Sequence, residues 1–134
     1  KLIESAKDAD LVIGSRYMEG GQVEEFGLFR ALNSKTAKLL SVVILGLNYY
    51  DPTSGYRVFK RELLEKLPWN QMISDGPSIV EEILYYCKKE NATIIEVPIF
   101  FKKRGAGETK ITPWIIIRWI MNLVRIRFSA MKHP

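Results

Sequence analysis

The first half of the chain is predicted to form a strand followed by a long helix. Residues 11–17, LVIGSRY, are an apolar, β-branched run that follows a helix-like segment at 2–7, a pattern typical of a buried parallel strand. Residues 18–25 contain a Gly-Gly pair and predict a flexible loop. Residues 28–47 are polar at first and almost wholly apolar later, which predicts a helix that is too short to span a bilayer.

A turn and two helices are predicted next. Residues 49–59, YYDPTSGYRVF, hold Asp-Pro and Gly at turn spacing and lead into a short strand. Residues 61–67 predict a short helix that ends at a proline, and residues 74–91 predict a second helix opened by serine, aspartate and proline. On this second helix, one of the neighbouring Glu81 and Glu82 is expected to face solvent and the other the functional site.

The last third of the chain is predicted to contain an edge strand and an amphipathic helix. Residues 93–101, TIIEVPIFF, suit a strand whose proline favours an edge or bulge position. In residues 113–128 and just beyond, polar residues recur every three or four positions and form one stripe: Arg118, Asn122, Arg125 and Ser129. Tryptophans beside arginines on an otherwise apolar helix favour a membrane interface, although an ordinary core helix has the same pattern.

Composition limits the partners and the chemistry. The chain has 134 residues, 47% of them hydrophobic, which is enough for one globular domain. Its net charge of +5 favours anionic partners. A single cysteine, Cys87, and a single histidine, His133, exclude a disulfide framework and a Cys/His metal site within this chain. Because the opening residues begin as if inside a helix, we expect a fragment of a longer protein.

A cationic loop after the predicted edge strand is the first candidate site. Four cations flank two glycines there: Lys102, Lys103, Arg104 and Lys110 around Gly105 and Gly107. Glycine lets the backbone approach a ligand closely, arginine offers a planar fork for phosphate, and lysine offers a point charge. A solvated basic loop without a ligand would have the same composition.

Other polar side chains stand where a phosphate or a sugar could bind. Arg16 closes the first strand, where the ligands of open α/β sheets gather. Arg30 and Ser34 are four residues apart and therefore share one helix face. The predicted turn offers Asp51 and Arg57, and its aspartate either orients a substrate group or only forms the turn.

Five stretches of the chain, taken in order, resemble a known family of enzymes. They are IGSRY, FRALNS, DPTSGYRVFKRELL, VEEIL and EVPIFFKKRGAGETK, and together they extend over nearly all of residues 8–110. They are similar to the C-terminal half of the polyprenol-phosphate glycosyltransferases, and most of all to the dolichol-phosphate mannose synthase group. The resemblance implies an α/β fold, a partial GT-A (Rossmann-like) domain whose acceptor half is residues 1–112, with residues 113–134 as an amphipathic membrane-interface helix and tail.

The resemblance also implies a reaction and roles for individual residues. The family transfers a sugar with inversion, mannose being favoured here, from a nucleotide-sugar such as GDP-mannose to a polyprenyl or dolichyl phosphate at the cytoplasmic face of a membrane. Carried onto this sequence, the catalytic candidates are Arg104, Lys110 and Asp51, and the substrate-binding candidates are Arg16, Arg30, Ser34, Arg57 and Glu82. Because the acceptor phosphate is already ionised, no strong general base is needed, and Asp51 and Glu82 are interpreted as positioning groups.

The family's nucleotide-binding half, with its metal-binding Asp-X-Asp motif, has no counterpart in these 134 residues. A divalent cation, Mg²⁺ or Mn²⁺, is therefore expected in the full-length enzyme, with ligands outside this chain. Residues 8–10, DAD, look similar to the motif, but they precede the first strand, where the family has a helix-to-strand turn. Parallel strands without their partners leave an open sheet edge, so self-association of the fragment is a further expectation.

Alternatives from other functional classes fit parts of the pattern. The amphipathic helix and the basic loop suit a non-catalytic module that binds anionic membranes, in which the number of charges matters more than their position. A glucosyltransferase that uses UDP-glucose and polyprenol phosphate is an alternative within the same family, with mannose favoured over glucose. Nucleic-acid binding is suggested by the net charge alone, and aromatic residues are not interleaved with the cations as that function requires, so no nucleic-acid partner is expected.

Overall fold

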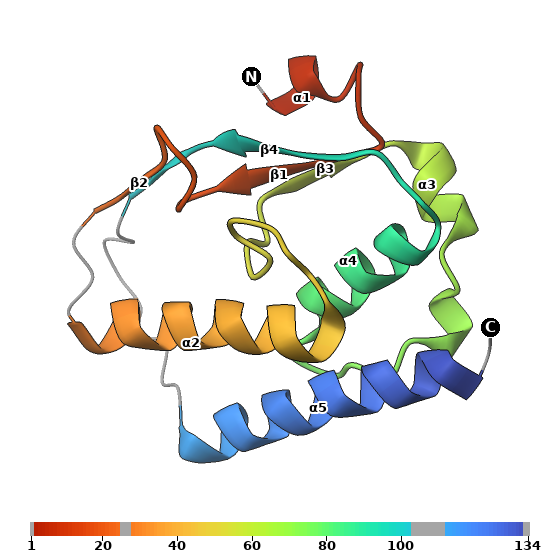
Figure 1. The fold of residues 1–134 in the computed structure, drawn as a ribbon. Helices are drawn as coiled ribbons and strands as arrows, with labels where there is room; N and C mark the ends of the chain where they lie inside the picture. Colours follow the sequence, from red (N-terminus) through yellow and green to blue (C-terminus); the bar gives the residue numbers. More distant parts are fainter. Residues whose placement is uncertain (1, 25–27, 103–111, 133–134) are drawn as a thin grey trace.

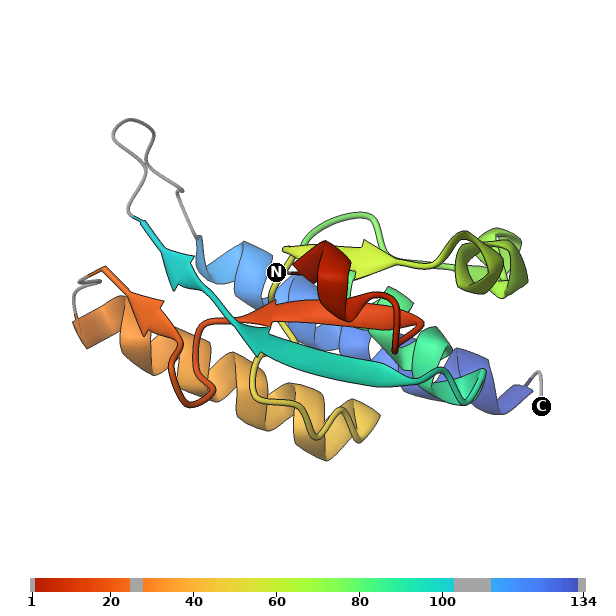
Figure 2. The ribbon, with the colours of Figure 1, turned by 90° about the horizontal axis from the view of Figure 1, so that it is seen from above.

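A small mixed sheet separates one short helix from a layer of longer helices (Figures 1 and 2). The computed structural model describes residues 2–24, 28–102 and 112–132, with side chains described except at 28–31 and 130–132. The helices are α1 (Leu2–Ser5), α2 (Leu28–Leu45), α3 (Arg61–Lys66), α4 (Ile79–Lys89) and α5 (Pro113–Lys132), with a 3₁₀ turn, η1, at Trp69–Gln71. The strands are β1 (Leu11–Ser15), β2 (Gln22–Val23), β3 (Arg57–Phe59), β4 (Ile94–Pro98) and β5 (Phe100–Phe101).

The central strand is β1, in a sheet of order β3-β1-β4. It runs parallel to β4, with Leu11 opposite Ile94 and Ser15 opposite Pro98, and it is buried along its whole length. The prediction of a buried parallel strand is therefore confirmed, and the antiparallel partner β3 is an addition to it. Pro98 ends β4 at an edge of the described sheet, as predicted, because proline has no N–H to offer a further strand.

The predicted loop at 18–25 contains a short strand, which corrects that part of the prediction. This segment contains β2, which pairs in parallel with β5, so that Gln22 lies opposite Phe100 and Val23 opposite Phe101. Gly21 is packed tightly just before β2, since a Cβ there would lie 2.7 Å from the backbone oxygen of Arg16. The glycine thus permits a close backbone approach at the end of β1, and the pairing that orders the segment comes from far along the chain.

The two faces of the main sheet pack against different helices. On one face, Leu11 and Ile13 share a buried apolar cluster with Leu84 of α4 and with Leu123 and Ile126 of α5. On the opposite face, Val12 and Val97 form a smaller cluster with Ala9, against which Leu2 and Ala6 pack. Side chains that alternate along β1 therefore serve two separate layers of the core.

Both neighbouring glutamates of α4 are buried, which corrects the prediction that one faces solvent. Glu81 is 2% exposed and Glu82 is 0% exposed. Glu82 accepts the backbone N–H groups of Ile73 at 2.9 Å and Ser74 at 2.8 Å. Glu81 accepts the indole N–H of Trp119 at 3.1 Å. A periodic pattern assigns such polar residues to the surface, whereas here loop backbone and α5 supply their partners.

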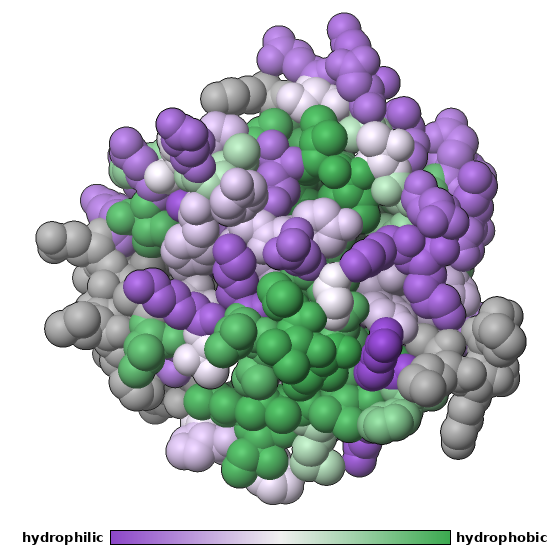
Figure 3. All heavy atoms as spheres, in the orientation of Figure 1, coloured by the Kyte–Doolittle hydropathy of each residue, from purple (hydrophilic) through white to green (hydrophobic). Residues whose placement is uncertain are grey.

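The helices α2 and α5 lie side by side and leave apolar side chains uncovered (Figures 1 and 3). On α2 the exposed large apolar residues are Leu32, Leu39 and Val43, and on α5 they are Trp114, Ile115, Ile117, Met121, Val124 and Phe128. We call this set the apolar face. Figure 3 shows a broad apolar area over these two helices. Within the described ranges, no helix combines the length and the apolar character that a membrane span requires.

Candidate functional site

Arg16 directly follows β1 and is bound by Asp51 through three hydrogen bonds. Its Nε donates to Asp51 Oδ2 at 2.7 Å and its Nη2 to Oδ1 at 2.8 Å, while its backbone N–H also reaches Oδ2, at 3.0 Å. The side chain of Asp51 is 0% exposed. A bidentate pair of this kind holds a guanidinium in one plane, and its hydrogen bonds raise the pKa of Arg16 above its usual value.

Aromatic rings flank the same guanidinium. The Cζ atom of Arg16 lies 5.1 Å from the ring centre of Tyr17 and 5.7 Å from that of Phe101, within the range of cation–π attraction. The hydroxyl of Tyr17 is in turn 2.5 Å from Oγ of Ser34 on α2. Tyr17 therefore connects the strand-end arginine to the helix that carries Ser34, and we call Arg16, Tyr17, Ser34, Asp51 and Phe101 the strand-end cluster.

The turn that supplies Asp51 is fixed to the sheet from two directions. Ser54 donates its hydroxyl to the carbonyl of Gly14 in β1 at 2.6 Å. Glu96 in β4 accepts the backbone N–H of Tyr50 at 2.7 Å and that of Asp51 at 2.9 Å. The Asp-Pro turn predicted from sequence thus becomes a rigid support, and Asp51 faces Arg16 from it.

Arg57 and Glu82, both candidates from the sequence, bind backbone groups and not the side chains of the strand-end cluster. Arg57 donates to the carbonyls of Val80 at 2.6 Å and Pro52 at 2.7 Å, and burial lowers the pKa of its guanidinium to about 10. Both oxygens of Glu82 accept backbone N–H groups. These geometries give the two side chains structural partners, and their roles toward a substrate stay predictions.

The structure describes only the backbone of one candidate cation, Arg30, and two others lie outside the residues it describes. The backbone of Arg30 is in α2, one helical turn before Ser34, and its side chain is not described. Arg104 and Lys110 lie outside the described residues. The chain enters the cationic loop through Phe101, whose ring is beside Arg16, so the start of that loop is placed next to the strand-end cluster.

Sequence reasoning missed several members of this arrangement. Tyr17 stands in the IGSRY motif and Glu96 opens the EVPI motif, but neither was assigned a role. Thr53 was also missed, although its hydroxyl accepts from Nη2 of Arg16 at 3.1 Å. Their positions inside the motif stretches could have indicated these residues as candidates. Their partners could not be predicted, because they lie 17 to 46 positions away in the sequence.

No metal centre is present among the residues that the structure describes. Within them, no group of three or more His, Cys, Asp or Glu side chains could hold a metal ion. The carboxylate of Asp51 is already engaged by the Arg16 guanidinium, and that of Glu96 by backbone N–H groups. The described part of the chain therefore does not fit a divalent cation.

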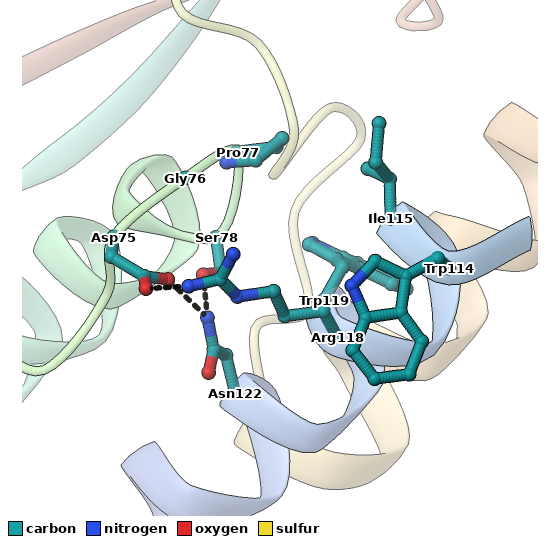
Figure 4. A pocket seen from close by; sticks show the side chains of 9 residues that line it. All are labelled: Asp75, Gly76, Pro77, Ser78, Trp114, Ile115, Arg118, Trp119 and Asn122. Carbon is teal, nitrogen blue, oxygen red and sulfur yellow. Dashed lines mark hydrogen bonds and ion pairs between the residues drawn. The ribbon is translucent and has the colours of Figure 1, made fainter. Parts of the chain in front are cut away.

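A shallow hollow lies between the start of α4 and the start of α5, with a volume of about 170 Å³ (Figure 4). Arg118 of α5 forms an ion pair with Asp75 at its border. Asn122 donates to Asp75 at 3.3 Å and to the hydroxyl of Ser78 at 3.0 Å. Two of the four residues in the polar stripe predicted for α5, Arg118 and Asn122, therefore bind the segment that precedes α4.

Comparison with curated proteins gives three informative matches. The chain is 32% identical to an undecaprenyl-phosphate mannosyltransferase of Micrococcus luteus over 97% of its own length and 54% of the relative. It is 38% identical to a polyprenol monophosphomannose synthase of Mycolicibacterium smegmatis over 78% of its length and 39% of the relative. It is 34% identical to a dolichol-phosphate mannosyltransferase of Pyrococcus furiosus over 94% of its length and 35% of the relative. No protein-family model matches the chain.

Proposed function

The chain is a homologue of polyprenol-phosphate mannosyltransferases over 35% to 54% of their length, and we propose that it forms the acceptor-side half of such an enzyme. In this proposal residues 1–112 belong to a GT-A glycosyltransferase domain and residues 113–134 form a membrane-interface helix and tail. The enzyme transfers mannose from a nucleotide-sugar, with GDP-mannose as the favoured donor, to a polyprenyl phosphate at the cytoplasmic face of a membrane.

The reaction needs positioned cations more than it needs a base. An oxygen of the polyprenyl phosphate forms a bond to the anomeric carbon of the sugar while the bond to the nucleoside diphosphate breaks, which inverts the configuration. Both partners are anions, so fixed positive charge must bring them together. Arg16, held by Asp51, is the described cation that suits this task, and Arg30, Ser34, Arg104 and Lys110 are proposed to complete the site.

A divalent cation bound by the other half of the full-length enzyme would stabilise the leaving diphosphate. Within this chain, the proposed work is done by Arg16 and its neighbours, which bind and orient the acceptor phosphate. Asp51 does not touch the substrate in this proposal, because both of its carboxylate oxygens accept hydrogen bonds from Arg16. It is a positioning residue that keeps the guanidinium in place.

The observation that carries the proposal is that one helix bears both a candidate site residue and exposed apolar residues. In α2, Ser34 is hydrogen-bonded to Tyr17 of the strand-end cluster, whereas Leu39 and Val43 of the same helix are exposed. A polyprenyl phosphate has the same two parts, an anionic head and a long apolar tail that stays in the bilayer. We propose that the apolar face on α2 and α5 rests in the bilayer surface and presents the lipid phosphate to Arg16.

A transfer assay in the full-length protein tests this proposal. Radiolabelled GDP-mannose and UDP-glucose are offered separately with polyprenyl phosphate in liposomes, and the labelled lipid is extracted. We expect mannolipid with the wild type and a loss of at least about 100-fold in the variant Arg16→Ala. The matched control is Arg61→Ala, because Arg61 is exposed on α3 and pairs only with its helix neighbour Glu65. Glucolipid in place of mannolipid would correct the donor, and no transfer with either would overturn the enzyme assignment.

A second candidate function is a non-catalytic module that binds anionic membranes, favoured by the exposed apolar face. This candidate predicts that Arg16→Ala and Arg61→Ala weaken vesicle binding equally, since both remove one positive charge. It also predicts no mannolipid from the full-length protein. The two functions are therefore separated by the same pair of variants.

A further inference from the structure

Glu96 lies behind the strand-end cluster and binds the backbone of the turn that carries Asp51. Its Oε2 accepts the N–H of Tyr50 at 2.7 Å and its Oε1 accepts the N–H of Asp51 at 2.9 Å. Each carboxylate oxygen thus takes one of two successive N–H groups. This arrangement fixes the orientation of the peptide units on both sides of Tyr50 with charge-assisted hydrogen bonds.

The turn transmits this orientation to Arg16 through the Asp51 side chain. The carboxylate of Asp51 is bound by the backbone N–H, Nε and Nη2 of Arg16, and Thr53 donates to its Oδ1 at 3.2 Å. Asp51 is 1% exposed, so solvent cannot substitute for a lost partner. A rotation of the Asp51 backbone would therefore move the guanidinium directly.

The Asp51 turn is bound by more charged side chains than the ion pair with Arg16 requires. Asp51 alone would balance Arg16, yet Glu96 places a second carboxylate against the same turn. Arg57 holds the turn from its other end by donating to the carbonyl of Pro52 at 2.7 Å. Two charged side chains from β4 and β3 thus clamp the few residues that aim Asp51 at Arg16.

We propose that Glu96 is a positioning residue, which sets the Arg16 guanidinium for the acceptor phosphate through the backbone and the carboxylate of Asp51. The inference rests on the proposed function, because it assigns Arg16 to a phosphate. Glu96 itself touches no substrate. If Glu96 only stabilised the turn, substituting it would affect residues 50 and 51 alone. If Glu96 positions Arg16, the effect of the substitution on transfer depends on the presence of Arg16.

A double-mutant cycle in the full-length enzyme tests this dependence. We expect Glu96→Gln to lower kcat/KM for polyprenyl phosphate by about 10- to 100-fold, because an amide cannot accept both N–H groups. In the Arg16→Ala background the same change is expected to lower residual transfer by less than about twofold. Equal losses in both backgrounds would overturn the proposal. Glu65→Gln is the control, since Glu65 is exposed on α3 and is expected to leave transfer unchanged.

Amide hydrogen exchange supplies a second measurement that needs no activity. We expect Glu96→Gln to speed exchange at Tyr50 and Asp51, and also at Arg16, whose backbone N–H is bound by Asp51. Faster exchange at 50 and 51 alone would reduce Glu96 to a structural cap and overturn the proposal. If Glu96→Gln does not fold, Glu96→Asp keeps the charge and is compared in the same way.

The two experiments distinguish an error in the positioning role of Glu96 from an error in the proposed function. A wild-type protein that transfers no sugar overturns the enzyme assignment, and the exchange at Arg16 still decides whether Glu96 acts on that residue. Conversely, suppose that the enzyme is active and that Glu96→Gln lowers transfer by the same factor in the wild type and in Arg16→Ala. That result supports the proposed function and contradicts the positioning role of Glu96.

Discussion

Trp119 on α5 donates its indole N–H to the buried carboxylate of Glu81 on α4, across 3.1 Å. The second oxygen of Glu81 has no hydrogen-bond partner among the described residues. Desolvation is the main reason that the pKa of Glu81 is raised to about 7. The helix α5 is thus docked on a carboxyl group that changes its charge near neutral pH.

The first prediction concerns the pH dependence of stability. A carboxyl group with a raised pKa in the folded state binds its proton more tightly there than in the unfolded chain, so stability falls as pH rises between about 4.5 and 7. Replacing Glu81 by Gln removes this loss and keeps an acceptor for Trp119. We expect Glu81→Gln to be more stable than the wild type at pH 8 by up to about 3 kcal/mol, and nearly equal at pH 4.

Chemical denaturation at a series of pH values measures this difference. Because every other titrating group is common to both proteins, the difference between wild type and Glu81→Gln isolates this one carboxyl. A difference that is constant from pH 4 to pH 8 would contradict a raised pKa for Glu81.

The second prediction concerns the ion pair between Arg16 and Asp51. Asp51→Asn replaces one carboxylate oxygen by an amide that donates toward Nε or Nη2 of Arg16, and it leaves a partly buried cation without a counter-charge. We expect a loss of about 2 to 4 kcal/mol in the free energy of unfolding. Removing the exposed pair on α3 by Glu65→Gln is expected to cost less than about 0.5 kcal/mol. Similar losses from the two substitutions would argue against a buried pair at the strand end.

The third prediction concerns the apolar face. Val43 of α2 is 71% exposed, so Val43→Asp should fold normally while placing a charge in the proposed lipid contact. We expect it to lower binding to liposomes by about tenfold or more in a flotation assay. Gln71→Asp, an exposed position in η1, makes the same change in charge and serves as the control. Equal loss in both variants would mean that the net charge, and not this face, governs binding.

The fourth prediction concerns the glycine behind Arg16. A Cβ at Gly21 would lie 2.7 Å from the carbonyl oxygen of Arg16 and 2.8 Å from that of Ser15, and these backbone atoms cannot move independently. We expect Gly21→Ala to cost about 1 to 3 kcal/mol of stability and to lower transfer by displacing the strand end. Gly55→Ala is the matched control, because no atom lies within 4 Å of a Cβ there. Thermal unfolding of both variants would show the contrast, and an unaffected Gly21→Ala would contradict the close packing.

Much of the local structure was readable from the sequence, because it depends on neighbouring residues. The β-branched run at the start predicted β1, the proline in EVPI predicted an edge position, and the helix-ending residues predicted where α3 ends and, within two residues, where α4 ends. The predicted start of α4 at residue 74 was wrong, because the helix begins at Ile79. The ordered motifs also predicted the relationship to polyprenol-phosphate mannosyltransferases, which the sequence comparisons confirm. These features follow from residue propensity, periodicity and motif order, all of which can be read from the linear sequence.

The tertiary structure decided everything that depends on partners distant in sequence. Asp51 meets Arg16 across 35 positions and Glu96 meets Tyr50 across 46, and the pairing of β1 with both β3 and β4 brings them together. The orientation of α5 was likewise open, because apolar side chains occupy more than one of its sides. Asn122 donates to Asp75 and Ser78, which precede α4, and it is buried there, whereas Phe128 is exposed. The sequence shows which side chains are apolar, but the packing of the helices determines which of them are buried.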